Sequence, residues 1–194
     1  MAFALTSDSG VKLTEVEEQT DDQLMLAYAR GERSAFDLLY ARYRQPLYGY
    51  LYRQCSNEAQ AGELFQETWL RVVASKARFE RQGRFRSWIF TLAHNCLVDM
   101  YRKNARQQNQ SLDEDIEGGM RPDEKADNRE IRRQLDTSVK SLPLEQRQAF
   151  CLHEEHGFSV KEIAEIQGIA AEAAKSRLRY AYRKLRTALQ EHHQ

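Results

Sequence analysis

The sequence has few residues that break helices or cross-link a chain. Its 194 residues include only 9 Gly, 3 Pro and 3 Cys. Because turns between many short strands use Gly and Pro, such low numbers disfavour a many-stranded β-fold. The cysteines (Cys55, Cys96 and Cys151) are odd in number, widely spaced and without a CxxC motif. That pattern argues against a disulfide framework and a cysteine zinc site, so we expect reduced thiols.

Long apolar runs are also missing. No stretch approaches the roughly 18 apolar residues that a membrane-spanning helix needs. The first 22 residues have neither the basic start nor the apolar core of a secretion signal. We therefore expect a cytoplasmic protein without membrane insertion. No acid pair, nucleophile triad or phosphate-binding glycine loop stands out, so we expect no enzyme activity and neither a cofactor nor a metal.

Charge is balanced overall but separated along the chain. Residues 1–22 carry 1 base and 6 acids, 23–110 carry 14 and 7, 111–130 carry 3 and 8, and 131–194 carry 11 and 8. Two basic segments separated by an acidic one favour two modules with a polyanionic partner, although solvated charged faces would give the same counts. We divide the chain into a flexible acidic leader (1–20), a first helical domain (21–106), an acidic linker (107–130) and a second domain (131–194). The linker contains Gly and Pro and almost no apolar residues, which predicts an extended or disordered segment.

Apolar residues recur at helical spacing through the first domain, which predicts a small bundle of amphipathic helices and an all-α fold. Thr20 with Gln23, and Ser34 with Asp37, have the spacing of capping pairs, so we expect helices to begin there. Pro46 lies within the second of these helices and predicts a kink.

A basic and aromatic stretch closes the first domain. Between Arg71 and Arg106 there are nine bases and two acids, with aromatic residues among them. Bases that hold phosphates and rings that stack on bases suit unpaired nucleic acid. Phe85 and Trp88 lie on the apolar stripe of this helix and are expected in the core. On a helical wheel three other residues lie off that stripe and are expected to be exposed, namely Phe90, His94 and Tyr101.

The second domain has the pattern of a helix-turn-helix. Ser159 and Glu162 form a capping box, and Gly168 breaks the short helix that follows. Small residues, Ala164 and Ala174, stand on either side of this turn, as a close helix crossing requires. The outer face of the next helix contains few acids and suits the major groove of duplex DNA. It carries Glu172, Ser176, Arg179 and Arg183, with Lys175 and Arg177 beside them.

Four sequence motifs together resemble a known family. They are ELFQETW at 63–69, FRSWIFTLAHN at 85–95, SVKEIAEI at 159–166 and KSRL at 175–178. This order and wording resemble the extracytoplasmic-function (ECF) sigma factors, the two-domain bacterial initiation factors of the sigma-70 family. The resemblance covers residues 21–105 and 138–189. It implies a protein that binds core RNA polymerase through the beta-prime and beta subunits, recognises promoter DNA and promotes its melting, under the control of an anti-sigma factor.

The resemblance also implies roles for particular residues. RNA polymerase would be bound by Glu63, Gln66 and Glu67. The melted -10 element would be read by the basic and aromatic stretch, with Arg81, Arg84, Arg86, Phe90, His94, Asn95, Tyr101 and Arg102 as the candidates. The -35 element would be read as duplex by the second domain, with Ser159, Glu172, Lys175, Ser176, Arg177, Arg179 and Arg183 as the candidates.

Two other functions compete with this interpretation. A helix-turn-helix regulator that binds duplex DNA by itself would explain the second domain, but not the polar face at Glu63, Gln66 and Glu67. A metallohydrolase is suggested by the segment from His153 to His156. An HExxH site needs its two histidines four residues apart on one helical face, and here they are three apart.

Overall fold

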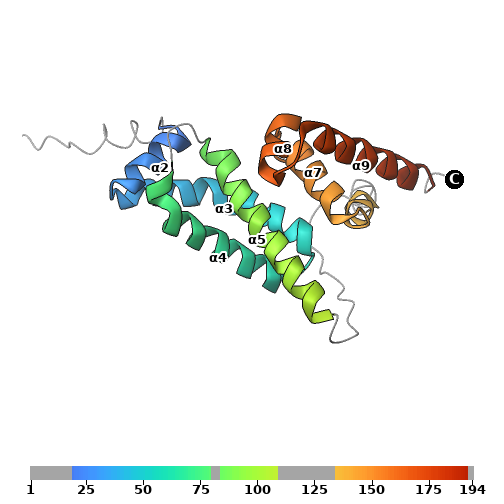
Figure 1. Cartoon of the computed structure of the whole chain (residues 1–194), viewed down its shortest axis with the longest axis horizontal. Coiled ribbons are helices and arrows are strands. Elements are labelled where there is room, and N and C mark those ends of the chain that lie inside the picture. Colours follow the sequence, from blue (N-terminus) through green and yellow to red (C-terminus); the bar gives the residue numbers. More distant parts are fainter. Residues whose placement is uncertain (1–18, 80–83, 109–133, 192–194) are drawn as a thin grey trace, which may run out of the picture.

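A computed structural model describes residues 19–79, 84–108 and 134–191, and within these ranges the regular structure is helical and no strand occurs (Figure 1). The two basic segments thus form two groups of helices, as the sequence predicted. Most of the leader, almost all of the acidic linker and the candidate residue Arg81 lie outside the described residues. No helix of the described ranges combines the length and apolarity that a membrane crossing requires.

In its described residues the first domain has four α-helices and one 3-10 turn. They are α2 (Asp21–Ala29), α3 (Arg33–Cys55), α4 (Glu58–Ser75), η1 (Lys76–Arg78) and α5 (Phe85–Gln108). α3 packs against α2 and α4, and α5 packs against α4, α3 and α2. The apolar stripes of these helices meet in one core, whose fully buried residues include Leu39, Leu47, Leu51, Ile89 and Leu97.

The sequence predicted two helix starts in this domain, and one of them is confirmed. The capping box is confirmed, because Thr20 Oγ1 accepts from the Gln23 N–H at 3.3 Å and Gln23 Oε1 accepts from the Thr20 N–H at 2.8 Å. The start expected at Ser34 is wrong. α2 ends in a turn at Gly31 (φ 107°), which returns the chain so that α3 is already helical from Arg33, without a side-chain cap.

The second domain contains the predicted helix-turn-helix. Residues 134–140 are helical and are followed by α7 (Leu144–Glu154), α8 (Val160–Gln167) and α9 (Ala171–Glu191). The capping box at the start of α8 is formed, with the Ser159 N–H donating to Glu162 Oε2 at 2.9 Å. α8 ends at Gly168, whose φ of 63° is left-handed, and the buried Ala164 and Ala174 allow α8 and α9 to approach each other.

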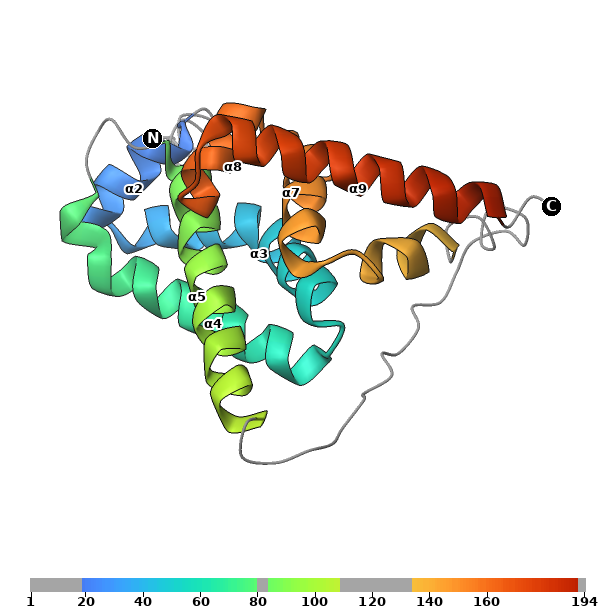
Figure 2. The ribbon, with the colours of Figure 1, turned by 45° about the vertical axis from the view of Figure 1, so that its right-hand side comes forward.

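The two domains pack against each other. α8 lies against α5, and α7 lies against α3 (Figure 2). The end of α3 supplies polar contacts, since Arg53 forms ion pairs with Asp136 (2.5 Å) and Glu155 (2.6 Å) of the second domain. Arg147 of α7 donates to the backbone carbonyl of Gln54 at 2.7 Å. The face of α5 that the sequence assigned to nucleic acid therefore lies next to the second domain.

Candidate nucleic-acid interface

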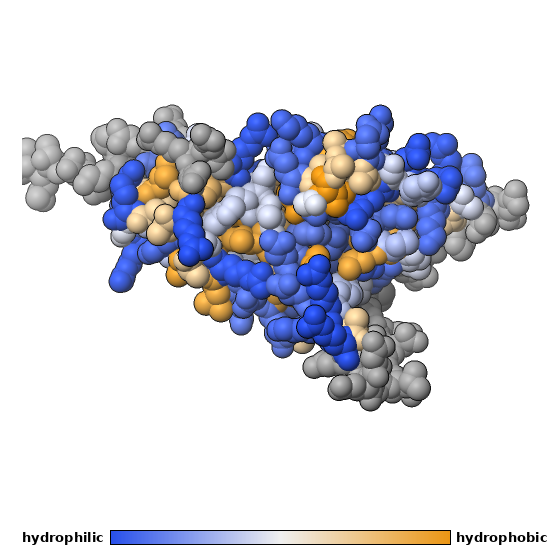
Figure 3. All heavy atoms as spheres, viewed as in Figure 1, coloured by the Kyte–Doolittle hydropathy of each residue, from blue (hydrophilic) through white to orange (hydrophobic). Residues whose placement is uncertain are grey.

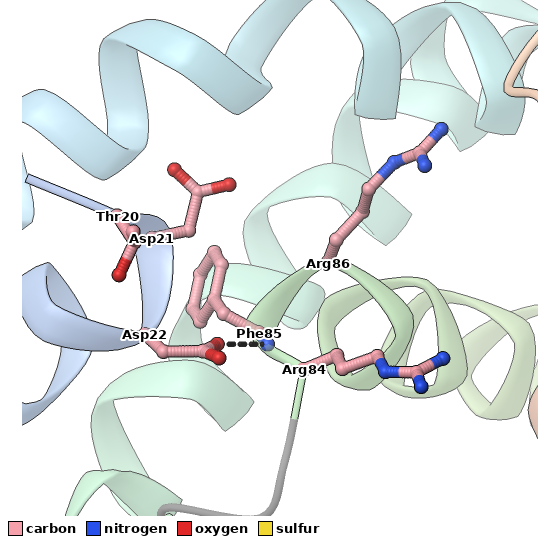
Figure 4. Close-up of a pocket in the computed structure, with 6 residues that line it drawn as sticks. All are labelled: Thr20, Asp21, Asp22, Arg84, Phe85 and Arg86. Atoms are coloured by element: carbon pink, nitrogen blue, oxygen red, sulfur yellow. Dashed lines mark hydrogen bonds between the residues drawn. The ribbon is translucent and has the colours of Figure 1, made fainter.

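The start of α5 is anchored by a side chain from α2. The Asp22 carboxylate accepts the backbone N–H of Phe85 at 2.6 Å, which satisfies a free donor at the helix start (Figure 4). This contact borders a small open pocket of about 220 Å³, lined also by Thr20 and Asp21. The guanidinium groups of Arg84 and Arg86 point away from Asp21 and Asp22.

Both of these arginines reach the second domain. Arg84 Nη1 lies 3.3 Å from Glu162 Oε1 of α8, in a pair that is largely exposed on the arginine side. The Arg86 guanidinium lies over the ring of Phe158, 4.3 Å from its centroid. Two of the candidate cations for the -10 element are thus engaged by the helix-turn-helix domain.

The expectation that Phe90, His94 and Tyr101 are exposed is wrong. Phe90 is 1% exposed and His94 is 7% exposed. Tyr101 is half-buried, and its hydroxyl donates to the carbonyl oxygen of Gln54 at 2.8 Å. The second domain covers Phe90 and His94 on that side of α5, whereas Tyr101 is held by Gln54 at the end of α3 in the first domain.

Phe90 is the centre of an aromatic cluster that joins the domains. Its ring centroid lies 5.4 Å from Tyr50 of α3, 4.7 Å from His156 and 5.1 Å from Phe158. His156 and Phe158 belong to the segment between α7 and α8. Edge-on and tilted ring contacts of this kind stabilise a packed interface beyond the area that they bury.

A groove of about 720 Å³ continues along α5 between the domains. Asn95 and Arg102 are exposed in it, and His94 and Tyr101 also line it. Burial lowers the pKa of His94, because the charged imidazolium loses hydration, and the nearby Arg177 acts in the same direction. The structure thus brings four of the -10 candidates together in one groove.

An exposed stripe on α4 is the candidate polymerase-binding face. Glu63, Gln66 and Glu67 are all exposed, as the sequence predicted for a polar face. The stripe continues into apolar residues that the sequence reasoning missed, because Leu70 is 64% exposed and Val73 is 41% exposed. Helical spacing could have indicated both residues, because Leu70 follows Gln66 and Glu67 by four and three residues, and Val73 follows Leu70 by three. We call these five residues the α4 stripe.

The outer face of α9 is the candidate duplex-binding surface. Glu172, Lys175, Arg179 and Arg183 are exposed, and Ser176 is half-buried. Hydrophilic side chains cover most of the visible surface along this helix (Figure 3). The guanidinium groups of Arg179 and Arg183 both lie over the ring of Tyr180, with centroid distances of 5.3 and 4.8 Å.

Two of the -35 candidates have other contacts. Arg177 turns toward the interdomain groove, where it pairs with Glu145 at 2.7 Å and donates to Gln167 Oε1 at 2.8 Å. Its half-buried side chain therefore does not share the outer face with Arg179. Ser159 is exposed, but its hydroxyl serves in the capping box with Glu162.

The geometry does not support a metal site at His153 and His156. Nδ1 of His153 lies 2.8 Å from the carbonyl oxygen of Phe158, whereas the His156 ring packs against Phe90. In the ranges that the structure describes, no three His, Cys, Asp or Glu side chains form a cluster suited to a metal ion. The cysteines are free thiols, and burial raises the pKa of Cys151 to about 12.

Comparisons with protein families match both domains in order. The model of sigma-70 region 2 matches residues 39–107, and the model of sigma-70 region 4 matches residues 132–185. The chain is 32% identical to RNA polymerase sigma factor CarQ of Myxococcus xanthus, over 86% of this chain and 96% of the relative. It is 33% identical to ECF RNA polymerase sigma factor SigL of Mycobacterium tuberculosis, over 84% of this chain and 93% of the relative.

Solved structures share the fold. The sigma factor RpoE, in complex with the anti-sigma factor NepR from Bartonella quintana, has a TM-score of 0.71 at 25% identity and covers 80% of this chain and 96% of its own. CnrH, in complex with the cytosolic domain of CnrY, has a TM-score of 0.68 at 22% identity, covering 89% and 99%. A stand-alone helix-turn-helix regulator is not favoured, since such a protein would lack the region 2 match.

Proposed function

The chain belongs to the ECF sigma factors of the sigma-70 family, and we propose which of its surfaces binds each partner in transcription initiation. As a sigma factor, it binds core RNA polymerase and promoter DNA and acts in initiation rather than as a catalyst. In our proposal the α4 stripe binds the polymerase, α5 binds the melted -10 element, and the outer face of α9 binds the -35 duplex.

The outer face of α9 is the observation that carries the proposal. Arg179 and Arg183 are exposed on a helix that follows a left-handed glycine turn, and Glu172 is the one acid among the described side chains of that face. Such a helix enters the major groove, where guanidinium groups donate to base edges and phosphates. Arg177 has no part in this contact while it pairs with Glu145, so we assign it to the groove.

For α5 the proposal requires a change of arrangement. An unpaired base stacks only on an accessible ring, and Phe90 is 1% exposed in the packed arrangement. Asn95 and Arg102 are exposed, yet they lie in a groove that the second domain closes on one side. We infer that the two domains separate before the -10 element binds, and that Arg84, Arg86 and Phe90 are released from the second domain in that step.

An anti-sigma partner is part of the proposal. Two structural neighbours were solved as sigma factor complexes, one with the anti-sigma factor NepR and one with the cytosolic domain of CnrY. We propose that a protein of this class binds the present chain and stabilises a form that does not engage the promoter. The exposed apolar residues Leu70 and Val73 of the α4 stripe would be accessible to it.

Permanganate footprinting of promoter DNA tests the role of α5. Asn95→Ala combined with Arg102→Ala removes two exposed groove residues, and we expect about tenfold less strand opening on a closed promoter with core polymerase present. Lys103→Ala is the matched control, because Lys103 is exposed on the same helix but does not line the groove. Opening by the double variant equal to that of the parent chain would remove α5 from the -10 contact.

A further inference from the structure

His156 occupies an unusual place in the interface between the domains. It follows α7, and its ring lies 4.7 Å from the ring of Phe90 and 5.8 Å from that of Tyr50, both in the first domain. Its Nε2 atom is shielded from solvent and has no hydrogen-bond partner among the described residues. A neutral ring tolerates such a site, whereas a protonated ring would hold an N–H and a charge without a partner.

The charges that face His156 are unfavourable to a cation. Arg86 of α5 and Arg53 of α3 both act on the ring, and both are positive. The carboxylates nearest to Arg53, those of Asp136 and Glu155, are held by its guanidinium group at 2.5 and 2.6 Å. The Tyr50 hydroxyl is uncharged, because burial raises its pKa. Burial, followed by Arg86 and Arg53, lowers the pKa of His156 to about 4.

We propose that His156 is a pH-sensitive latch between the domains: the neutral ring holds them together, and protonation of the ring releases the second domain from α5. The release of the second domain is inferred from the interface contacts alone and does not depend on the proposed function. The consequence, that acidification makes the -10 face accessible, rests on the proposed function of α5.

The direction and size of the effect follow from linkage. In the separated form His156 is hydrated and titrates near its ordinary value of 6.5, whereas in the packed form it titrates at about 4. Above pH 6.5 the ring is neutral in both forms and the packed form has its full stability. Between these two values the separated form binds the proton more tightly, so the packed form loses about tenfold in population for each pH unit. From pH 7.5 to pH 5.5 the ratio of packed to separated chains should fall about tenfold.

Of the other titrating groups near the interface, Glu155 acts in the opposite direction, Glu162 titrates outside this range of pH, and His94 acts in the same direction. The pKa of Glu155 is raised by burial in the packed form, so acidification acting through Glu155 would favour packing, the opposite direction. The pKa of Glu162 is lowered by its hydrogen bonds to Ser159, so it titrates below its ordinary value of 4.5, outside this range of pH. His94 acts in the same direction as His156 but faces the polar groove, with Glu145, Gln148 and Arg177 around it.

Energy transfer between two dyes on the full chain measures the separation. Gln45→Cys in α3 and Arg186→Cys in α9 place the dyes on exposed positions of the two domains. Cys55, the half-buried cysteine, is replaced by Cys55→Ser, and Cys96 and Cys151 are buried. The ratio of packed to separated chains is recorded from pH 7.5 to pH 5.5, under conditions in which far-UV circular dichroism stays constant.

The parent chain should lose about tenfold or more in this ratio. His156→Phe keeps the ring contacts without a titrating nitrogen and should lose most of this change, because only His94 then acts in the same direction. His156→Gln provides a second variant that cannot be protonated. His94→Gln is the matched control, since it alters the other interface histidine and should retain most of the change. A ratio that does not change with pH in the parent, or an equal change in His156→Phe, would overturn the latch. A latch that opens without increasing promoter melting would instead contradict the role of α5.

Discussion

The ring of Phe90 on α5 packs edge-on against the ring of Phe158 from the second domain, with centroids 5.1 Å apart and an interplanar angle of 69°. This contact covers the side of α5 that the family resemblance assigns to unpaired promoter DNA. The two rings cannot keep this contact while Phe90 stacks on a base. Binding of the -10 element and packing of the domains are therefore competing states of one surface.

Arg53 should matter for this competition, because it bridges two carboxylates of the second domain. Arg53→Gln removes the ion pairs with Asp136 and Glu155 and leaves both acids without a partner. Since these groups are partly exposed, we expect a moderate effect, a severalfold shift toward separated domains that shrinks at high salt. A larger radius of gyration in small-angle X-ray scattering would report it. Arg42→Gln breaks a pair with Asp21 inside the first domain and should leave the radius unchanged.

The α4 stripe should depend on its apolar end as well as on its acids. Leu70→Ser removes a side chain that is 64% exposed, so the fold loses little. If Leu70 is buried against the polymerase, core affinity should fall by about 1 to 3 kcal/mol, or roughly 5- to 150-fold. Fluorescence anisotropy with labelled chain and core polymerase measures this affinity. Glu58→Ala, exposed in the first turn of the same helix, is the control, and an equal loss in both variants would argue against the stripe.

Arg179 and Arg183 should differ in what they recognise. If Arg179 faces base edges, Arg179→Ala should cost about 1 to 3 kcal/mol at one promoter position and relax the preference there. If Arg183 holds a phosphate, Arg183→Ala should weaken all promoters alike and reduce the salt slope by about one. Competition among promoter variants at two salt concentrations separates these outcomes. Identical effects of both substitutions on every promoter would contradict the division of roles.

The helix-turn-helix should be sensitive to the glycine at its turn. Gly168 adopts a φ of 63°, a left-handed conformation that costs alanine about 1 kcal/mol. Gly168→Ala should lower the free energy of unfolding of the second domain by about that amount in thermal denaturation. Gly62 lies within α4 with nothing near its Cβ position, so Gly62→Ala should be neutral or stabilising. Destabilisation by Gly62→Ala but not by Gly168→Ala would contradict this assignment.

Local features of the sequence were sufficient for much of the fold. The capping boxes at Thr20 and Ser159 and the left-handed Gly168 depend on contacts within a few residues, and all three are formed. Ser34 failed because the tight turn at Gly31 determines where α3 begins, and the capping spacing contains no information on that turn.

The candidate site was harder to predict, because burial of one helix depends on every element that packs against it. The periodicity of α5 located the face toward its own domain correctly, with Phe85 fully buried. The periodicity contains no information on packing against a second domain, so Phe90 and His94 were expected to be exposed to solvent. The apolar end of the α4 stripe is hard to predict for the reverse reason, since Val73 follows the buried Val72 and helical spacing alone does not separate the two.

Run-off transcription with purified core RNA polymerase on a random promoter library tests the central claim most directly. The chain should bind promoter duplex only weakly by itself and, with core polymerase, should produce transcripts from a subset of templates that share two elements. The chain would then determine which promoters the polymerase opens. Nanomolar, sequence-specific duplex binding by the isolated chain at physiological salt, together with no transcript that depends on it, would contradict the account.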